Sequence, residues 1–110
     1  LSLLITSNSA FSTPSPPIGD PYICTRTGTG RVNIRKGPGI NHPKGLEQVG
    51  SGGISVTRYF ESNNNSLPSG FSNFTTFVRH RVRPDGSPGW SKIGNNQWIG
   101  WVRNDFLCYE

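Results

Sequence analysis

The sequence predicts a small all-β domain, and three features of the chain point to this fold class. First, 14 glycines and 9 prolines interrupt the 110 residues at short intervals, which is typical of a turn-rich chain. Second, the stretches between these turns are short, and they alternate apolar with polar residues or are rich in β-branched and aromatic residues. Third, the hydrophobic content of 32% suits one domain with a modest core, which 3 Trp, 3 Tyr and 6 Phe can help to fill.

The predicted strands follow this pattern along the chain. In the second strand Val32 and Ile34 alternate with Asn33 and Arg35, so we expect the first pair to point inward and the second outward. The turn at residues 37–39, Gly-Pro-Gly, then ends this strand. In chain order, the expected strands are residues 22–27, 31–35, 46–49, 54–60, 74–83, 90–93 and 98–102.

Turns and loops separate these strands. Asp-Gly at 85–86 and Pro-Gly at 88–89 are turn sequences, and residues 94–97 are interpreted as the loop of a hairpin between the last two strands. The segment 61–73 is rich in Asn, Ser, Pro and Gly, which predicts a long, exposed, inserted loop.

Nucleotide-binding and catalytic motifs find little support in the sequence. Gly28 and Gly30 are followed by Asn33 where a dinucleotide-binding motif has its third glycine, and the chain has no P-loop pattern. Its 6 acidic residues are scattered, and neither H-x-x-x-H nor C-x-x-C occurs. We therefore expect a non-catalytic protein with no metal site and no cofactor.

The N-terminal segment differs in composition from the rest. Residues 1–21 run from the apolar stretch LSLLI into small and proline-rich residues, and we interpret them as a signal-peptide remnant and linker before a domain at 22–110. This interpretation predicts a secreted or periplasmic protein. A tail on a cytosolic protein is the alternative. No stretch approaches the ~20 apolar residues of a membrane-spanning helix.

Two cysteines, Cys24 and Cys108, lie near the two ends of the predicted domain. In an exported protein a pair placed in this way is expected to form a disulfide. Closing a loop of about 85 residues could stabilise the fold by roughly 4 to 5 kcal/mol. The alternative is a catalytic thiol assisted by His42 or His80, but nothing local in the sequence places either histidine beside a cysteine.

The net charge of +5 favours anionic partners. Arg79, Arg81 and Arg83 alternate with His80 and Val82 in one predicted strand, which places three guanidinium groups along one face at steps of about 6.6 Å. Such a row suits the phosphate, sulfate or carboxylate groups of a polyanion. The alternative is a solvated edge strand whose charges protect it from aggregation.

Aromatic and polar side chains supply further candidates for ligand contact. Indole, phenol and imidazole rings can stack on sugars or bases, although each could equally be packed within the fold. The outward-facing pair of the second strand could touch a ligand, or its asparagine could hydrogen-bond a neighbouring turn. The full set of candidate ligand-binding residues is Asn33, Arg35, His42, Tyr59, Arg79, Arg81, Arg83, Trp90 and Trp98.

Two motifs in this order resemble bacterial SH3 domains, which are small β-barrels attached to many exported proteins. VNIRKGPG at 32–39 resembles the strand-plus-turn signature of that family. WSKIGNNQWIGWVRNDFL at 90–107 resembles its closing hairpin, followed by a single helical turn around Asn104 and Asp105. Together with ISVTRYF at 54–60, the resemblance covers most of the predicted domain.

The resemblance implies a small SH3-like β-barrel with a long inserted loop. It implies that Gly100 lets the chain bend sharply and that Trp101 and Val102 fill the interior. It also brings the first and last strands together, where a bond between the two cysteines would form. The connection over 61–88 is longer than is usual for the family, and Asn41-His42 stands where an aromatic residue is common.

The resemblance further implies a binding module for a cell-envelope polymer or peptide, such as peptidoglycan. An arginine-based binder of nucleic acid or sulfated glycan is one alternative. A regulatory domain that binds a partner protein is another.

Overall fold

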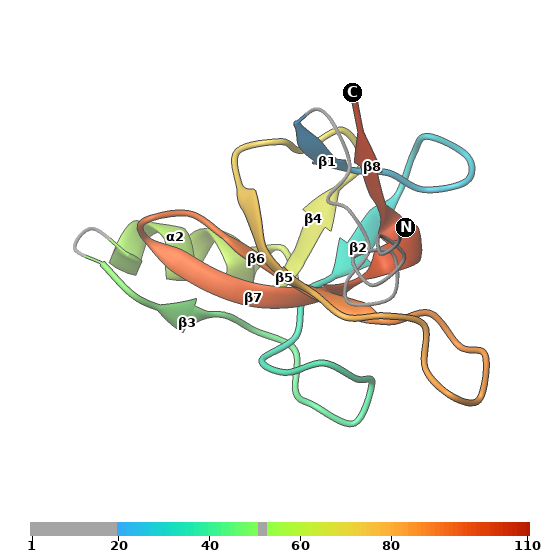
Figure 1. The fold of residues 1–110 in the computed structure, drawn as a ribbon. Helices are drawn as coiled ribbons and strands as arrows, with labels where there is room; N and C mark the ends of the chain where they lie inside the picture. Colours follow the sequence, from blue (N-terminus) through green and yellow to red (C-terminus); the bar gives the residue numbers. More distant parts are fainter. Residues whose placement is uncertain (1–19, 51–52) are drawn as a thin grey trace, which may run out of the picture.

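The computed structural model describes residues 20–50 and 53–110, and the chain within these ranges is mostly β-structure with one short helix (Figure 1). The expectation for segment 1–21 thus falls almost entirely outside the described residues. In chain order the elements are β1 (Pro21–Ile23), β2 (Arg31–Asn33), β3 (Glu47–Gln48), α2 (Gly53–Ser62), β4 (Ser66–Pro68), β5 (Thr75–Arg79), β6 (Trp90–Gly94), β7 (Trp98–Arg103), the 3-10 turn η1 (Asn104–Phe106) and β8 (Leu107–Tyr109).

Within the described residues, the strands form three small antiparallel sheets. Their orders are β1-β8, β2-β4 and β3-β7-β6-β5. Backbone hydrogen bonds link these sheets: Arg35 and Trp101 exchange two bonds of 2.9 and 2.8 Å, which join the chain after β2 to β7. Ile23 likewise bonds Gly70 and Phe71, which joins β1 to the chain after β4. The expected hairpin between the last two long strands is confirmed as β6-β7.

The core lies between these sheets and takes side chains from almost every element. The alternation predicted for the second strand is confirmed, since Val32 and Ile34 are buried while Asn33 is exposed and Arg35 is half-buried. The single helical turn expected near Asn104 is confirmed as η1. The buried apolar cluster consists of Ile23, Val32, Ile34, Phe60, Leu67, Phe74, Ile93, Trp98, Val102 and Leu107.

Strand β7 corrects the roles expected for Gly100 and Trp101. The strand runs without a break through Gly100, and a Cβ there would lie 2.3 Å from Cγ2 of the buried Ile34, so this position requires glycine for space. Burial alternates along the strand, which puts Val102 in the core and Trp101 on the opposite, half-buried face. The Trp101 ring stacks there on His80, with centroids 5.1 Å apart.

The strand predicted over 54–60 is wrong, because these residues lie in helix α2. A strand would place Arg58 on the same face as Val56 and Phe60. In the helix Val56 and Phe60, four residues apart, both pack on the core while Arg58 is exposed. The Phe60 ring meets the ring of Trp98 edge to face at 5.1 Å, which fixes the helix on the start of β7.

The helix ends in a motif that the sequence interpretation assigned to an exposed loop. Asn64 and Asn65 have φ values of 57° and 56°, the left-handed conformation that asparagine tolerates better than most residues. The Asn65 N–H donates to the Phe60 carbonyl and the Asn64 N–H to the Glu61 carbonyl, which is the bond pair of a Schellman cap. The three consecutive asparagines at 63–65 are therefore a helix stop.

Further boundaries differ from the sequence prediction, and the first strand, expected over 22–27, ends at Ile23. The segment 61–73 is only partly exposed, because β4 pairs with β2 and buries Ser66 and Leu67. Strand β5 ends at Arg79, four residues short of the predicted end, after a bulge between Thr76 and Val78. The bulge disturbs the regular pairing that a strand extending to Arg83 would need.

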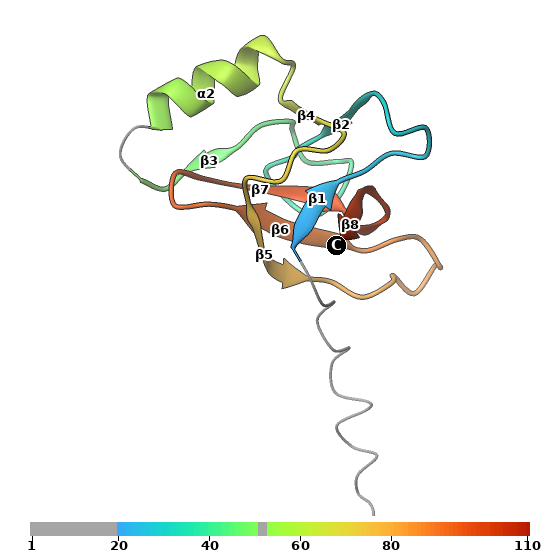
Figure 2. The same ribbon diagram turned by 90° about the horizontal axis from the view of Figure 1, so that it is seen from above.

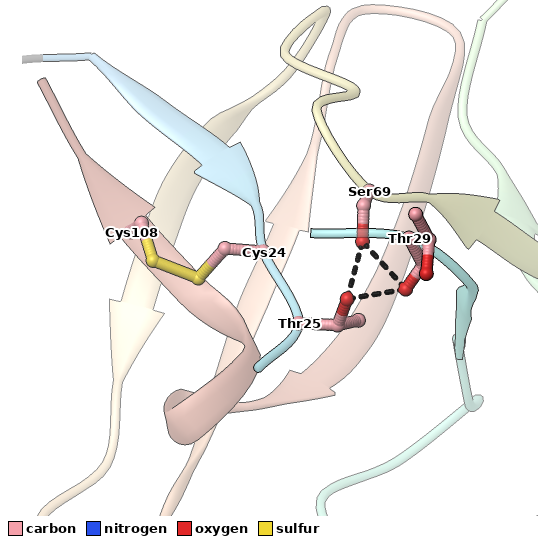
Figure 3. Close-up of a disulfide and its surroundings, with 5 residues drawn as sticks. All are labelled: Cys24, Thr25, Thr29, Ser69 and Cys108. Carbon is pink, nitrogen blue, oxygen red and sulfur yellow. Dashed lines mark hydrogen bonds between the residues drawn. A yellow bond between two sulfur atoms is a disulfide. The ribbon is translucent and has the colours of Figure 1, made fainter. Parts of the chain in front are cut away.

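The disulfide between Cys24 and Cys108 is confirmed, with the two Cα atoms 5.9 Å apart (Figure 3). It joins the end of β1 to β8, whose backbones already pair. Beside it, the hydroxyl of Thr25 lies 2.7 Å from that of Ser69 and also bonds the carbonyl of Thr29 (Figure 3). The bridge and this small hydroxyl network together fix the chain as it leaves β1.

Candidate functional site

A surface cleft of about 430 Å³ lies between two loops that project from the same side of the molecule (Figure 1). The first loop follows β2 and the second joins β5 to β6. We call this feature the loop cleft. It is lined by Gly39, Ile40, Asn41, Arg83, Asp85, Ser87, Pro88, Trp90 and Arg103. Helix α2 lies at the opposite end of the molecule from the second loop (Figure 2).

Arg103 is a positioned cation at the end of β7. Its Nη2 donates to Oδ2 of Asp105 at 2.9 Å, and its guanidinium carbon lies 5.4 Å from the centroid of the Phe106 ring. Both partners belong to η1, so the turn fixes the arginine at the cleft. About 38% of the arginine side chain remains exposed, and a guanidinium has five N–H donors. Arg103 can therefore bind a ligand anion while it keeps Asp105.

The second loop is closed by its own hydrogen bonds around Arg83. The Arg83 N–H donates to the Ser87 carbonyl at 3.0 Å, and the Gly86 N–H donates to the Arg83 carbonyl at 2.8 Å. Gly86 has a φ of 86°, which explains the Asp-Gly turn sequence. Both Arg83 and Asp85 lie outside the paired strands, and this turn holds them at the cleft.

The same turn stabilises the charged form of Asp85. Its Oδ1 accepts hydrogen bonds from the hydroxyl and the backbone N–H of Ser87, at 2.6 and 2.9 Å. These two bonds lower the pKa of the Asp85 carboxyl below its ordinary value, and the charge of Arg83 contributes in the same direction. The cleft thus holds one fixed anion together with two arginines.

The change Ser87→Ala is expected to raise the pKa of Asp85 back toward its ordinary value, since the largest cause of the lowering is the serine hydroxyl. Because the folded pKa is lowered, the carboxylate stabilises the turn at pH values above the unfolded pKa, and this stabilisation is lost as the pH falls through the folded pKa. An NMR titration of the Asp85 carboxyl in wild type and variant measures the shift. An unchanged pKa in the variant would contradict this account.

Apolar contacts of the cleft come from both of its loops. Ile40 is 75% exposed where it lines the cleft, so most of its side chain is available for contact with a ligand. Trp90 also lines the cleft but is only 6% exposed, so its ring offers little contact area to a ligand. A neighbouring hollow of about 290 Å³ shares Arg83 and Trp90 and adds Pro38, His80, Arg81, Val82, Pro84 and Gly89.

The loop cleft brings together only two of the residues proposed from the sequence, Arg83 and Trp90. Trp98 is buried against Phe60, which leaves it as a core residue in this fold. Tyr59 is half-exposed on helix α2, at the far end of the molecule from the second loop (Figure 2). The predicted stacking residues are thus distributed between the core and separate surfaces.

The candidates after β2 support the first loop. The Arg35 guanidinium donates to the His42 carbonyl at 2.8 Å, and the His42 N–H donates to the Gly39 carbonyl. The His42 ring lies against Gly37, where a Cβ would come within 2.4 Å of it. Arg35 and His42 therefore shape the loop that carries Ile40, while Asn33 lies exposed on β2.

The arginine row has a different arrangement from the one expected. All three arginines are exposed, but only Arg79 lies within a strand. Its guanidinium carbon is 5.8 Å from the centroid of the Tyr109 ring, whereas Arg83 lines the loop cleft. The prediction that the three guanidinium groups lie at equal steps along one strand face is therefore wrong beyond Arg79, because the chain leaves β5 there.

Three residues of the loop cleft were not among the candidates proposed from the sequence: Arg103, Asp85 and Ile40. Arg103 is the last outward-facing residue of a strand that alternates apolar and polar positions, and Asp85 is part of a turn sequence. Ile40 follows Gly-Pro-Gly in a turn-rich loop, so its exposure could have been expected from the sequence.

The described part of the chain contains no group of three or more His, Cys, Asp and Glu residues placed to hold a metal ion. No helix within residues 20–50 and 53–110 has the length and apolar character required to cross a bilayer. Comparison with models of known protein families, with curated proteins and with solved structures finds no match.

Proposed function

We propose that this chain is a non-catalytic, exported binding module with an SH3-like barrel that recognises a cell-envelope polymer or peptide. The observation that carries the proposal is the loop cleft, where two arginines, one aspartate and the apolar Ile40 and Trp90 line one open hollow. Such a mixture of charged and apolar groups suits an extended ligand with anionic groups, bound by ion pairs and by apolar contact.

The barrel part of the proposal is supported by the order in which strands contact one another. Backbone bonds connect β5, β6, β7, the chain after β2, then β4, β1 and β8. The hydroxyl of Tyr109 on β8 lies 3.0 Å from that of Thr76 on β5, so a side-chain contact links the two ends of this series. The 3-10 turn before the last strand also agrees with the family resemblance.

Export is supported by the Cys24–Cys108 disulfide, because such bonds persist in oxidising compartments and are rare in the cytosol. The composition of segment 1–21 points the same way.

Co-sedimentation with purified peptidoglycan tests the proposed function. The variant Arg83→Ser/Arg103→Ser is expected to weaken binding about tenfold, which corresponds to two modest ion pairs. The matched control is Arg26→Ser/Arg58→Ser, which removes the same charge from exposed positions outside the cleft. Equal binding by wild type and the cleft variant would refute the proposal, and so would an equal loss in the control. Thermal melting checks that both variants remain folded.

A polyanion binder is the second candidate, favoured by the exposure of Arg79, Arg81 and Arg83 and by the net charge of +5. If it is correct, affinity for duplex DNA falls steeply with salt, with a log-log slope of about −0.9 for each phosphate contact. Changing the three arginines to serine then makes the slope shallower on DNA and on heparin. A shallow slope in the wild type rules this candidate out.

A further inference from the structure

We propose that the loop cleft selects ligands that carry a carboxylate and an ammonium group together, with the carboxylate bound by Arg83 and Arg103 and the ammonium by Asp85. This inference rests on the proposed function and specifies the chemistry of its ligand as a zwitterionic peptide segment.

The two arginines reach the cleft from different elements. Arg83 comes from the turn of the second loop and Arg103 from the end of β7. Arg103 is held by Asp105 and Phe106, so its position does not depend on a ligand. Guanidinium groups bind carboxylates through paired N–H donors, which makes an anionic end group the natural partner of this part of the cleft.

Asp85 supplies the opposite charge in the same cleft. The two hydrogen bonds that it accepts from Ser87, one from the N–H and one from the hydroxyl, both fall on Oδ1. They fix the carboxylate in place and leave Oδ2 outside the hydrogen bonding of this turn. A fixed carboxylate whose second oxygen is not used by the turn is suited to bind a ligand ammonium.

The same aspartate discriminates against purely anionic ligands. A phosphate or sulfate chain that follows the arginines would bring like charge toward Asp85, which costs affinity. A ligand with both charges satisfies the two arginines and the aspartate together. Ile40 and Pro88, which also line the cleft, offer such a ligand an apolar contact.

The test compares Asp85→Asn with wild type by NMR titration against three probe peptides. The probes are N-acetyl-Ala-Lys with a free carboxylate, the same peptide acetylated on the lysine amine, and the same peptide with an amidated carboxyl end. Asparagine keeps an Oδ1 that can accept from Ser87, so the turn is retained. The control Glu47→Gln removes an equal charge from exposed β3, outside the cleft.

Asp85→Asn is expected to weaken binding of the free peptide about two- to fivefold, the range for solvent-exposed ion pairs. It is expected to leave binding of the amine-acetylated peptide unchanged or tighter, and Glu47→Gln is expected to change neither affinity. In the wild type, either modification of the peptide weakens binding. Tighter binding of the free peptide by Asp85→Asn would overturn the inference, as would equal losses for the free and acetylated peptides.

The experiments distinguish a failure of this inference from a failure of the proposed function. If the wild type co-sediments with peptidoglycan through the arginines but binds none of the three probes, the zwitterion inference fails and the binding module stands. If it neither co-sediments nor binds the probes, both fail.

Discussion

The variant Cys24→Ser/Cys108→Ser is expected to lose about 4 kcal/mol of folding stability. The bridge closes a loop between residues 84 positions apart, so it removes much conformational freedom from the unfolded chain. β1 and β8 are three residues each, so the backbone pairing beside the bridge is short. A loss of this size is a large fraction of the stability of a small domain.

Urea unfolding of the oxidised wild type, the reduced wild type and the double serine variant measures this loss. The reduced protein and the variant are expected to unfold at similar, much lower urea concentrations. Intact mass should rise by about two daltons on reduction of the wild type, as expected for one disulfide. Equal midpoints for oxidised and reduced protein would show that the bridge contributes nothing to stability.

The substitution Gly100→Ala is expected to destabilise the fold by about 1 to 3 kcal/mol. The added Cβ would lie 2.3 Å from Cγ2 of Ile34 and 3.1 Å from Cδ2 of Leu46. Ile34 is fully buried and its Cγ2 is attached directly to Cβ, so it cannot move aside as the end of a flexible chain could. Either β7 or the chain after β2 must shift.

Thermal and urea unfolding measure the effect, with two comparisons that identify its cause. Gly28→Ala shows the cost of backbone strain without a clash, because Gly28 has a φ of 76° and a Cβ at this position would meet no atom within 4 Å. Gly100 has no positive φ, so its loss is expected to come from the clash alone. Adding Ile34→Ala removes the obstructing methyl group. The double variant Ile34→Ala/Gly100→Ala should therefore lose less stability than the two single losses added together. Additive losses would contradict a direct clash between these positions.

The parts of the fold that the sequence predicted well are those where burial follows a two-residue period. Val32 and Ile34 are buried as expected, and the hairpin β6-β7 joins the strands that the asparagine-rich turn suggested. The inward and outward faces of such segments can be predicted from the sequence, because each strand has one face in the core and one outside. The cysteine pair was predictable from its placement at the two ends of the domain.

Helix α2 could not be identified in the same way, because its residues favour a strand locally. Val56, Thr57 and Tyr59 have β-branched or aromatic side chains, and tertiary packing decides the outcome. The contact of Phe60 with Trp98 joins residues 38 positions apart, which no local pattern reveals. The asparagines that cap the helix were visible, but they suit a loop equally well.

The candidate site was predictable only in part for a related reason. Arg83 was found through its position in a basic stretch, yet its partners Arg103 and Asp85 come from a strand end and a turn. Their meeting depends on the shape of the loop between β5 and β6 and on its position beside the end of β7 in the same sheet. Burial of Trp98 likewise depends on the helix, so its sequence neighbours gave no indication of its surroundings.

The pairing of β1 with β8 also determines how this domain would respond to tension. The Glu110 N–H donates to the Asp20 carbonyl at 3.1 Å, so the two ends of the described domain lie side by side. A pull on these ends would straighten only the few residues outside the Cys24–Cys108 bridge. Everything between the cysteines would stay unstretched while the bond lasts, and the load would pass through sulfur and not through the core.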